Sequence, residues 1–243
     1  MSNVQKKPSG CKRLIIALLV FLALAIVLSG AWLSHRIAEN KMEHEVTFYS
    51  NDGTVLKVDI VRNGQPANPP AKLQMLYGTI FKAWDADISK ITSSIDVNPI
   101  CECVTEKSNV FAVESAYGKS GGTVVVPVRL CGEVCTAGFD LTINYDPAVL
   151  ELISVQEDGG VIYSDEKLGE IKLNYVSTDN TKADVDLCYL EFSIKAEAEE
   201  SAITMKMNKI FAYDEKESVD DIKLGVPKYT IINGTVFVLP QGE

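Results

Sequence analysis

Histidine is scarce in this chain, with only His35 and His44 among 243 residues. Both precede the strand-rich part of the sequence, so we expect no histidine in the folded modules. This absence excludes Ser/His and Cys/His nucleophilic pairs and histidine-ligated metals from the folded core. Aspartates and glutamates could supply the two carboxylates of a glycosidase, but nothing in the sequence singles out one pair. We predict that the chain is not an enzyme and uses no cofactor or metal.

A basic excess is also lacking, since the formal net charge is −10. Four cations lie within the first 13 residues; without them, 19 basic residues face 33 acidic ones, a charge of −14. This polarity argues against nucleic acid as a partner. Part of the negative charge comes from one acidic cluster. The cluster lacks the Asp-x-Asp-x-Asp-Gly spacing of a calcium loop, so a solvated loop is favoured over a calcium site. The cluster consists of Asp214, Glu215, Glu217, Asp220 and Asp221.

The twenty residues from Leu14 to Leu33 contain no charge at all. At about 1.5 Å per residue, a helix of this length matches a hydrocarbon core of about 30 Å. The cations before it predict a cytoplasmic tail over residues 1–13, a membrane-spanning signal-anchor over 14–34 and an ectodomain outside the cell membrane. The alternative is a signal peptide cleaved near Ser29-Gly30-Ala31, which would release a secreted protein.

The chain has six cysteines, which could form disulfides in an exported protein. Cys131 and Cys135 bracket a short loop, so a disulfide between them is geometrically plausible. Cys101 and Cys103 are too close to bridge each other in an extended segment, where alternate residues lie about 6.5 to 7 Å apart. Cys188 shares an apolar strand face and is expected to be a buried thiol. A zinc site formed by Cys101, Cys103, Cys131 and Cys135 is disfavoured, because their spacing is wrong for paired knuckles.

Alternating apolar residues dominate the second half of the chain. Val124, Val126 and Val128 share one strand face, and Phe139, Leu141, Ile143 and Tyr145 share another. Asp146-Pro147 then interrupts the pattern, because proline lacks an amide donor. We expect nine short strands and hence a two-sheet β-sandwich, over residues 110–114, 123–130, 138–145, 150–156, 170–176, 186–195, 203–207, 210–213 and 230–238.

A smaller unit precedes the sandwich at residues 44–100. Val-Thr-Phe-Tyr and Thr-Val-Leu-Lys-Val-Asp-Ile-Val flank Asn51-Asp52-Gly53, which predicts a β-hairpin. With Phe-Lys-Ala-Trp-Asp at 81–85 and Ile-Thr-Ser-Ser-Ile-Asp-Val at 91–97, the segment resembles the Listeria-Bacteroides repeat, a β-grasp-like surface module. Ala83 stands where that family usually has glycine before tryptophan. The resemblance implies a small β-grasp-like spacer.

Two motifs in the sandwich carry a second resemblance. They are Tyr-Asp-Pro-x-Val-Leu-Glu at 145–151 and Asn-Gly-Thr-Val-x-Val at 233–238. With the order of the strands, they make residues 110–239 similar to a cohesin domain, the receptor module for dockerins in bacterial cellulosomes. The resemblance implies an all-β, jelly-roll sandwich over residues 104–243. It also implies a dockerin-containing partner, such as a carbohydrate-active enzyme or a scaffold protein.

The alternation also predicts the binding surface. When the apolar residues of segments 138–145 and 170–176 point inward, the residues between them point outward, and the cohesin resemblance implies that this sheet face binds the partner. The outward residues are Asp140, Thr142, Asn144, Lys172, Asn174 and Val176, with Ser177 at the strand end and Gly138 beside them. Asp140 is expected to be the main polar anchor.

Two alternatives to a dockerin receptor stay open. One is a carbohydrate-binding or adhesion module with a polysaccharide partner, and the other is a structural surface stalk. The proposed outward positions include no aromatic side chain, which favours a protein partner over a sugar. The sequence thus predicts a membrane-anchored, surface-displayed, cohesin-like receptor.

Overall fold

The structure is a computed structural model that describes residues 21–22, 24–32, 42–70, 73, 79–104, 109–132, 136–158, 162–181, 185–195, 198–213 and 224–241. The described residues between 21 and 32 are helical, and all other regular elements are strands. No helix in the described part of the chain is long and apolar enough to cross a membrane. Much of the segment from Leu14 to Leu33 lies outside the described residues, so the membrane-spanning anchor stays a prediction.

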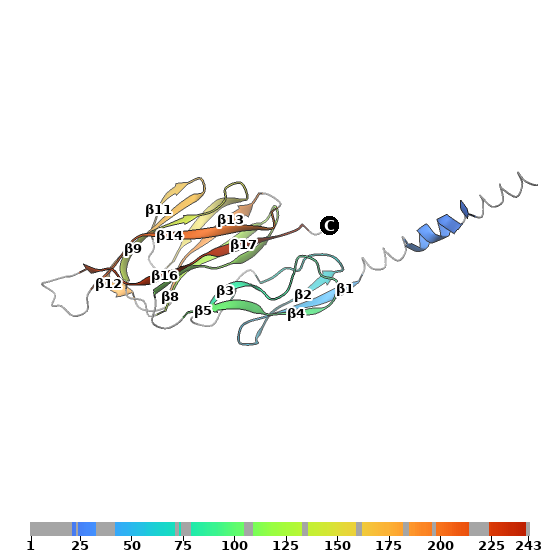
Figure 1. Cartoon of the computed structure of the whole chain (residues 1–243), viewed down its shortest axis with the longest axis horizontal. Helices are drawn as coiled ribbons and strands as arrows, with labels where there is room; N and C mark the ends of the chain where they lie inside the picture. The colour runs from blue at the N-terminus through green and yellow to red at the C-terminus, as the bar shows by residue number, and fades with distance from the viewer. Residues whose placement is uncertain are drawn as a thin grey trace, which may run out of the picture.

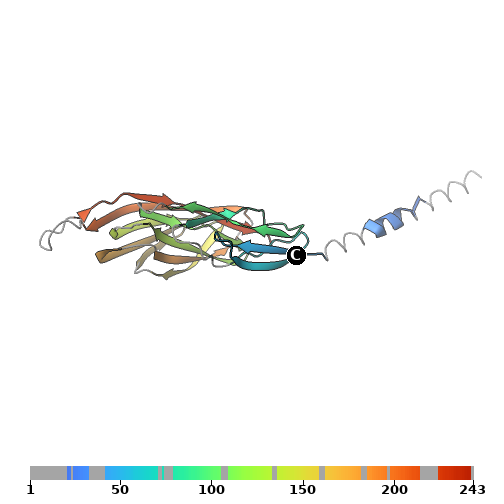
Figure 2. The same cartoon turned by 90° about the horizontal axis from the view of Figure 1, so that it is seen from below.

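The predicted β-sandwich is confirmed, and it consists of a seven-stranded and a five-stranded sheet (Figures 1 and 2). The larger sheet has the order β11-β12-β9-β14-β17-β7, with β15 paired to β14. Its strands are β7 (Ala116–Lys119), β9 (Thr136–Asn144), β11 (Ile162–Lys167), β12 (Glu170–Thr181), β14 (Glu200–Tyr213), β15 (Leu224–Gly225) and β17 (Gly234–Leu239). The smaller sheet has the order β10-β13-β8-β6-β16. Its strands are β6 (Asn109–Val113), β8 (Thr123–Cys131), β10 (Leu150–Glu157), β13 (Val185–Ile194) and β16 (Tyr229–Ile232).

The core between the sheets follows the alternation of the sequence. Seven apolar side chains that the alternation predicts to point inward are at most 3% exposed: Val126, Phe139, Leu141, Ile143, Leu173, Leu190 and Phe192. Each comes from an every-second-residue series that points inward from its strand. The strand register predicted from period two is therefore confirmed on both sheets.

The number of strands differs from the prediction of nine, because the described part of the sandwich has twelve. Segments 203–207 and 210–213 are one strand, β14, with a register shift between Met207 and Lys209. Segment 230–238 is instead two strands that separate at Asn233 and join different sheets, β16 beside β6 and β17 beside β7. Gly234 is required there, since a Cβ atom would lie 2.6 Å from the Glu114 carbonyl oxygen. Strands β7, β11 and β15 were not predicted.

The N-terminal module contains the predicted hairpin, β1 (Glu43–Tyr49) and β2 (Val55–Arg62), in antiparallel register. Strand β4 (Ile95–Val97) pairs with β1 in parallel, while β3 (Thr79–Trp84) and β5 (Pro99–Cys103) form a separate antiparallel pair. The expectation that the modules lack histidine is wrong, because His44 lies within β1 and its Nε2 is 3.0 Å from Asn63 Oδ1. The resemblance of this module to the β-grasp repeat stays a prediction.

The module packs directly on the sandwich, near the C-terminal end of β17 (Figures 1 and 2). Its core around Phe81 and Trp84 includes Leu239 of β17 and is covered by Tyr117 of β7. The Tyr117 hydroxyl accepts a hydrogen bond from the Trp84 amide at 3.2 Å, and the Ser115 amide donates to the Phe81 carbonyl at 3.3 Å. The predicted division at 44–100 and 104–243 therefore separates segments that share a core, and the boundaries themselves stay predictions.

Candidate functional site

Strands β9 and β12 are hydrogen-bonded neighbours in the larger sheet, so the residues predicted to form the binding surface lie together. The register pairs Asp140 with Asn174 and Thr142 with Lys172. Gly138 in turn lies opposite the 75% exposed Val176. Asn144, at the end of β9, is exposed as well. These positions form one surface, which we call the outer face.

Ser177 is the exception among the predicted site residues. The register of β12 against β9 shifts after Val176, so Ser177 lies in an irregular stretch of the strand. Its carbonyl oxygen accepts a hydrogen bond from the Tyr213 hydroxyl at 3.2 Å, and its own hydroxyl accepts one from the Asp179 amide at 3.2 Å. The prediction that the strand ends at Ser177 is wrong, because β12 continues to Thr181, and Ser177 is part of the local structure of its irregular stretch.

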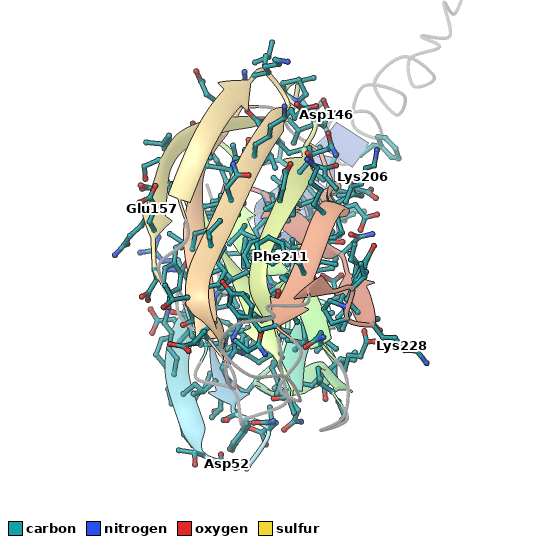
Figure 3. All side chains as sticks on the ribbon, turned by 90° about the vertical axis from the view of Figure 1, so that its left-hand side faces the viewer. Asp52, Asp146, Glu157, Lys206, Phe211 and Lys228 are labelled. Atoms are coloured by element: carbon teal, nitrogen blue, oxygen red, sulfur yellow. The ribbon has the colours of Figure 1, made fainter. Side chains whose placement is uncertain are left out.

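A third strand, β14, completes the outer face on the other side of β9, and the sequence prediction did not include it. Figure 3 looks onto β12, β9 and β14, with Phe211 near the middle of the surface. The register places Lys206 opposite Thr142, Lys209 opposite Asp140 and Phe211 opposite Gly138. The outer face therefore carries two lysines and an aromatic ring besides the predicted polar residues.

The β-bulge between Met207 and Lys209 of β14 determines how Asp140, the predicted polar anchor, is held. At the β-bulge, Asn208 and Lys209 are both exposed, although consecutive residues of a regular strand point to opposite faces. The Asn208 side-chain amide donates to Asp140 Oδ1 at 3.0 Å and to Thr142 Oγ1 at 2.9 Å. Asp140 is thus fixed in orientation. Thr142 is only 7% exposed, so it contributes less surface than predicted.

Phe211 occupies the space above Gly138. A Cβ atom built on Gly138 would lie 2.2 Å from Phe211 Cζ and 2.6 Å from Cε1, closer than atoms approach without overlap. The glycine therefore allows the aromatic ring to lie against the backbone of β9. The predicted outward positions on β9 and β12 contain no aromatic residue, as expected. The aromatic ring of the outer face comes from Phe211 of β14, which the prediction did not include.

The sequence did contain a signal for β14. Ile203, Met205 and Met207 alternate with Thr204 and Lys206, which is the same period-two pattern that identified β9. Asn208-Lys209 breaks this alternation, and a break of this kind predicts two strands, 203–207 and 210–213, instead of one. Allowing for one extra residue at a bulge would have continued the pattern through Ile210 and Phe211.

A partly buried ionic cluster lies on the opposite sheet, near the N-terminal module. Arg129 contacts Glu114 through Nη1 at 3.0 Å and Asp186 through Nε at 2.9 Å. The latter N–H is not aligned for a hydrogen bond, so this contact is an ion pair alone. Burial raises the pKa of Glu114, and the charge of Arg129 opposes that rise. Glu114 also lines a cavity of about 410 Å³, together with Phe81, Trp84 and Tyr117 among others. The three residues of the ionic cluster connect neighbouring segments, and none of them is a typical nucleophile.

The predicted covalent and metal sites fall partly outside the described residues. Cys135 and the acidic residues 214–221 are not described, so the disulfide to the buried Cys131 and the nature of the acidic loop stay predictions. Within the described ranges, no group of three or more histidine, cysteine or acidic residues could hold a metal ion. Cys188 is buried as expected, and desolvation raises its pKa to about 12.

Comparison with known proteins gives a family match over the part of the chain that carries the outer face. Residues 110–226 match the family model described as "Cohesin domain". No curated protein matches the chain.

Several solved structures are similar to about half of the chain. The seventh type I cohesin of ScaB from Pseudobacteroides cellulosolvens is 14% identical, covers 56% of this chain and 95% of its own, and has a TM-score of 0.48. The sixth cohesin of scaffoldin B from Acetivibrio cellulolyticus, solved in complex with a mutant of the Cel5 dockerin, is 22% identical, with coverages of 54% and 99% and a TM-score of 0.46. A non-cellulosomal cohesin from the archaeon Archaeoglobus fulgidus is 24% identical, with coverages of 54% and 91% and a TM-score of 0.43. By the family match, residues 110–226 of this chain are a cohesin domain.

Proposed function

We propose that this chain is a receptor whose cohesin domain binds a dockerin-bearing protein through the outer face of β12, β9 and β14. The observation that carries the proposal is the family match, since residues 110–226 include all three of these strands. Cohesin domains are non-catalytic binding modules, in agreement with the prediction that the chain is not an enzyme.

The contacts on the outer face support a role in recognition. The two hydrogen bonds from Asn208 hold Asp140 and Thr142 in place before any partner arrives. A side chain that is already oriented loses less conformational entropy on binding. The Asp140 carboxylate can accept charge-assisted hydrogen bonds from a partner, and these are stronger than bonds between neutral groups.

Display outside the cell membrane is the second part of the proposal. The uncharged segment from Leu14 to Leu33 and the cations before it support a single span with a cytoplasmic N-terminus. In that orientation, the cohesin domain would present an enzyme or a scaffold protein at the cell surface. Protease added to intact cells should remove the ectodomain, whereas an ectodomain that is cut only after lysis would refute this topology.

Calorimetry can test the binding site directly. The full-length chain, kept in a nonionic detergent, would be titrated with purified dockerin domains encoded by the organism that makes it. Asp140→Ala should weaken binding by about 1 to 3 kcal/mol, because donors of the partner would be left unpaired. Glu151→Ala is a matched control, since Glu151 is an exposed carboxylate on β10 of the opposite sheet.

Two outcomes would contradict the proposal. If none of the dockerins binds, the chain is not a dockerin receptor. If Asp140→Ala and Glu151→Ala change the affinity equally, the outer face is not the binding surface. The Asp140→Ala chain itself should lose only about 0.5 to 1.5 kcal/mol of folding stability, the usual contribution of one hydrogen bond.

A further inference from the structure

The outer face has an apolar strip that crosses three strands. Val176 of β12 and Phe211 of β14 both lie opposite Gly138 of β9 in the register. Because Gly138 has no side chain and Phe211 reaches over it, the ring and the valine lie on either side of the same backbone position. Val176 is 75% exposed, so the strip is open to solvent on the valine side. Exposed apolar side chains that adjoin in this way favour contact with an apolar group of a partner.

Two lysines of β14 lie on the same face as this strip: Lys209 adjoins it, and Lys206 lies further along the strand, opposite Thr142. Lys206 and Lys209 are both exposed, and neither forms an ion pair with any residue of the described ranges. Lys209 is two residues from Phe211, which corresponds to about 7 Å along a strand. The bulge is the reason that Lys209 points outward, since a regular strand would have turned it toward the core.

The charge of this edge contrasts with that of the rest of the molecule. After the first 13 residues, the chain carries 33 acidic and 19 basic side chains, yet this part of β14 has two cations that form no ion pair in the described ranges, although Asp140 lies opposite Lys209 in the register. Unpaired lysines at the rim of an apolar contact attract carboxylates of a partner and raise the association rate. They also disfavour a partner that places basic residues there.

From this arrangement we propose that Lys206, Lys209 and Phe211 determine the specificity of the receptor. The partner they select is a dockerin that presents an apolar side chain flanked by at least one carboxylate. The apolar group covers the strip formed by Val176 and Phe211, and the carboxylate lies within reach of Lys209. This inference rests on the proposed function, because it takes the outer face as the dockerin surface.

Surface plasmon resonance would test the inference with the same dockerin domains and the full-length chain. Charge reversal in the double variant Lys206→Glu/Lys209→Glu should lower the affinity at least tenfold, mainly through a slower association. It should also reduce the dependence of binding on salt, since screened charges act on the association rate. Lys228→Glu provides the matched control, because Lys228 is an exposed lysine immediately before β16 in the opposite sheet (Figure 3).

The apolar part needs a separate pair of variants. Phe211→Ala should lower the affinity at least tenfold through faster dissociation, whereas Phe211→Leu keeps an apolar group and should lose less. Thermal unfolding of both variants shows whether the sheet is intact. A change of the responsible dockerin carboxylate to lysine should restore binding to the Lys206→Glu/Lys209→Glu chain.

The possible failures are distinguishable. If no dockerin binds the unchanged chain, the proposed function is wrong and the inference falls with it. If a dockerin binds but the double reversal matches Lys228→Glu in affinity and in salt dependence, the dockerin receptor stands and the lysines do not select the partner. Equal affinities of Phe211→Ala and the unchanged chain would likewise overturn the role of the apolar strip.

Discussion

The contact between Gly138 and Phe211 gives the sharpest test of the geometry of the outer face. Gly138→Ala adds a single carbon atom at a position 2.2 Å from Phe211 Cζ. The ring must then move, or the two strands must separate slightly. The Tyr175 carbonyl oxygen is a second close neighbour, at 2.9 Å from the added atom.

The expected magnitude combines two opposing effects. Overpacking costs about 1 to 3 kcal/mol, whereas replacing glycine by alanine within a strand gains about 0.5 to 1 kcal/mol from the lower entropy of the unfolded chain. Gly138→Ala should therefore destabilise the protein by about 1 to 2 kcal/mol. In a chain that already carries Phe211→Ala, the contact with the Tyr175 carbonyl oxygen remains, so the same change should still destabilise the protein, but by less than in the unchanged chain.

Urea unfolding of four chains, followed by far-ultraviolet circular dichroism, measures this difference. The four are the unchanged protein, the two single variants and the double variant. Their coupling energy should be at most about 2 kcal/mol, within the range found for residues in contact. Comparable m-values are needed for the free energies to be compared. A coupling below about 0.3 kcal/mol would refute the placement of the ring over Gly138.

Two further predictions concern the core. Leu141→Ala should cost about 2 to 5 kcal/mol in the same unfolding assay, because Leu141 is fully buried and its truncation leaves a cavity; a loss below about 0.5 kcal/mol would contradict its position. Cys188 has an ordinary pKa of 9.0 that burial raises to about 12, so the unfolded chain loses this proton first as the pH rises and stability falls between those two values. Unfolding measured from pH 8 to 11 should show a smaller fall in Cys188→Ala, and an identical fall in both chains would contradict the burial of this thiol.

Local periodicity was sufficient to predict the core of the sandwich and the outward residues of two strands. Leu141 and Leu173 point inward and Asp140 and Asn174 outward because side chains alternate along any regular strand. The pairing of β9 with β12 follows from no local pattern, and the resemblance to a family supplied it.

The rest of the site depends on contacts that are distant in sequence. Phe211 lies more than 70 residues from Gly138, and nothing near either residue indicates that they meet. The bulge at Asn208 hid the continuity of β14, because one extra residue changes the direction of every side chain after it. The small size of the N-terminal module favours packing against a neighbour, but no local pattern indicates that Trp84 and Tyr117 meet.

Lysine footprinting tests most directly the claim that the outer face of the cohesin domain binds a dockerin. The full-length chain would be treated with an acetylating reagent, with and without a saturating dockerin, and the modified lysines would be identified by mass spectrometry. The account predicts that the dockerin protects Lys206 and Lys209 on β14 and leaves Lys195 and Lys228, which flank strands of the opposite sheet, as reactive as before. Protection of Lys195 and Lys228 with unchanged reactivity of Lys206 and Lys209 would contradict it.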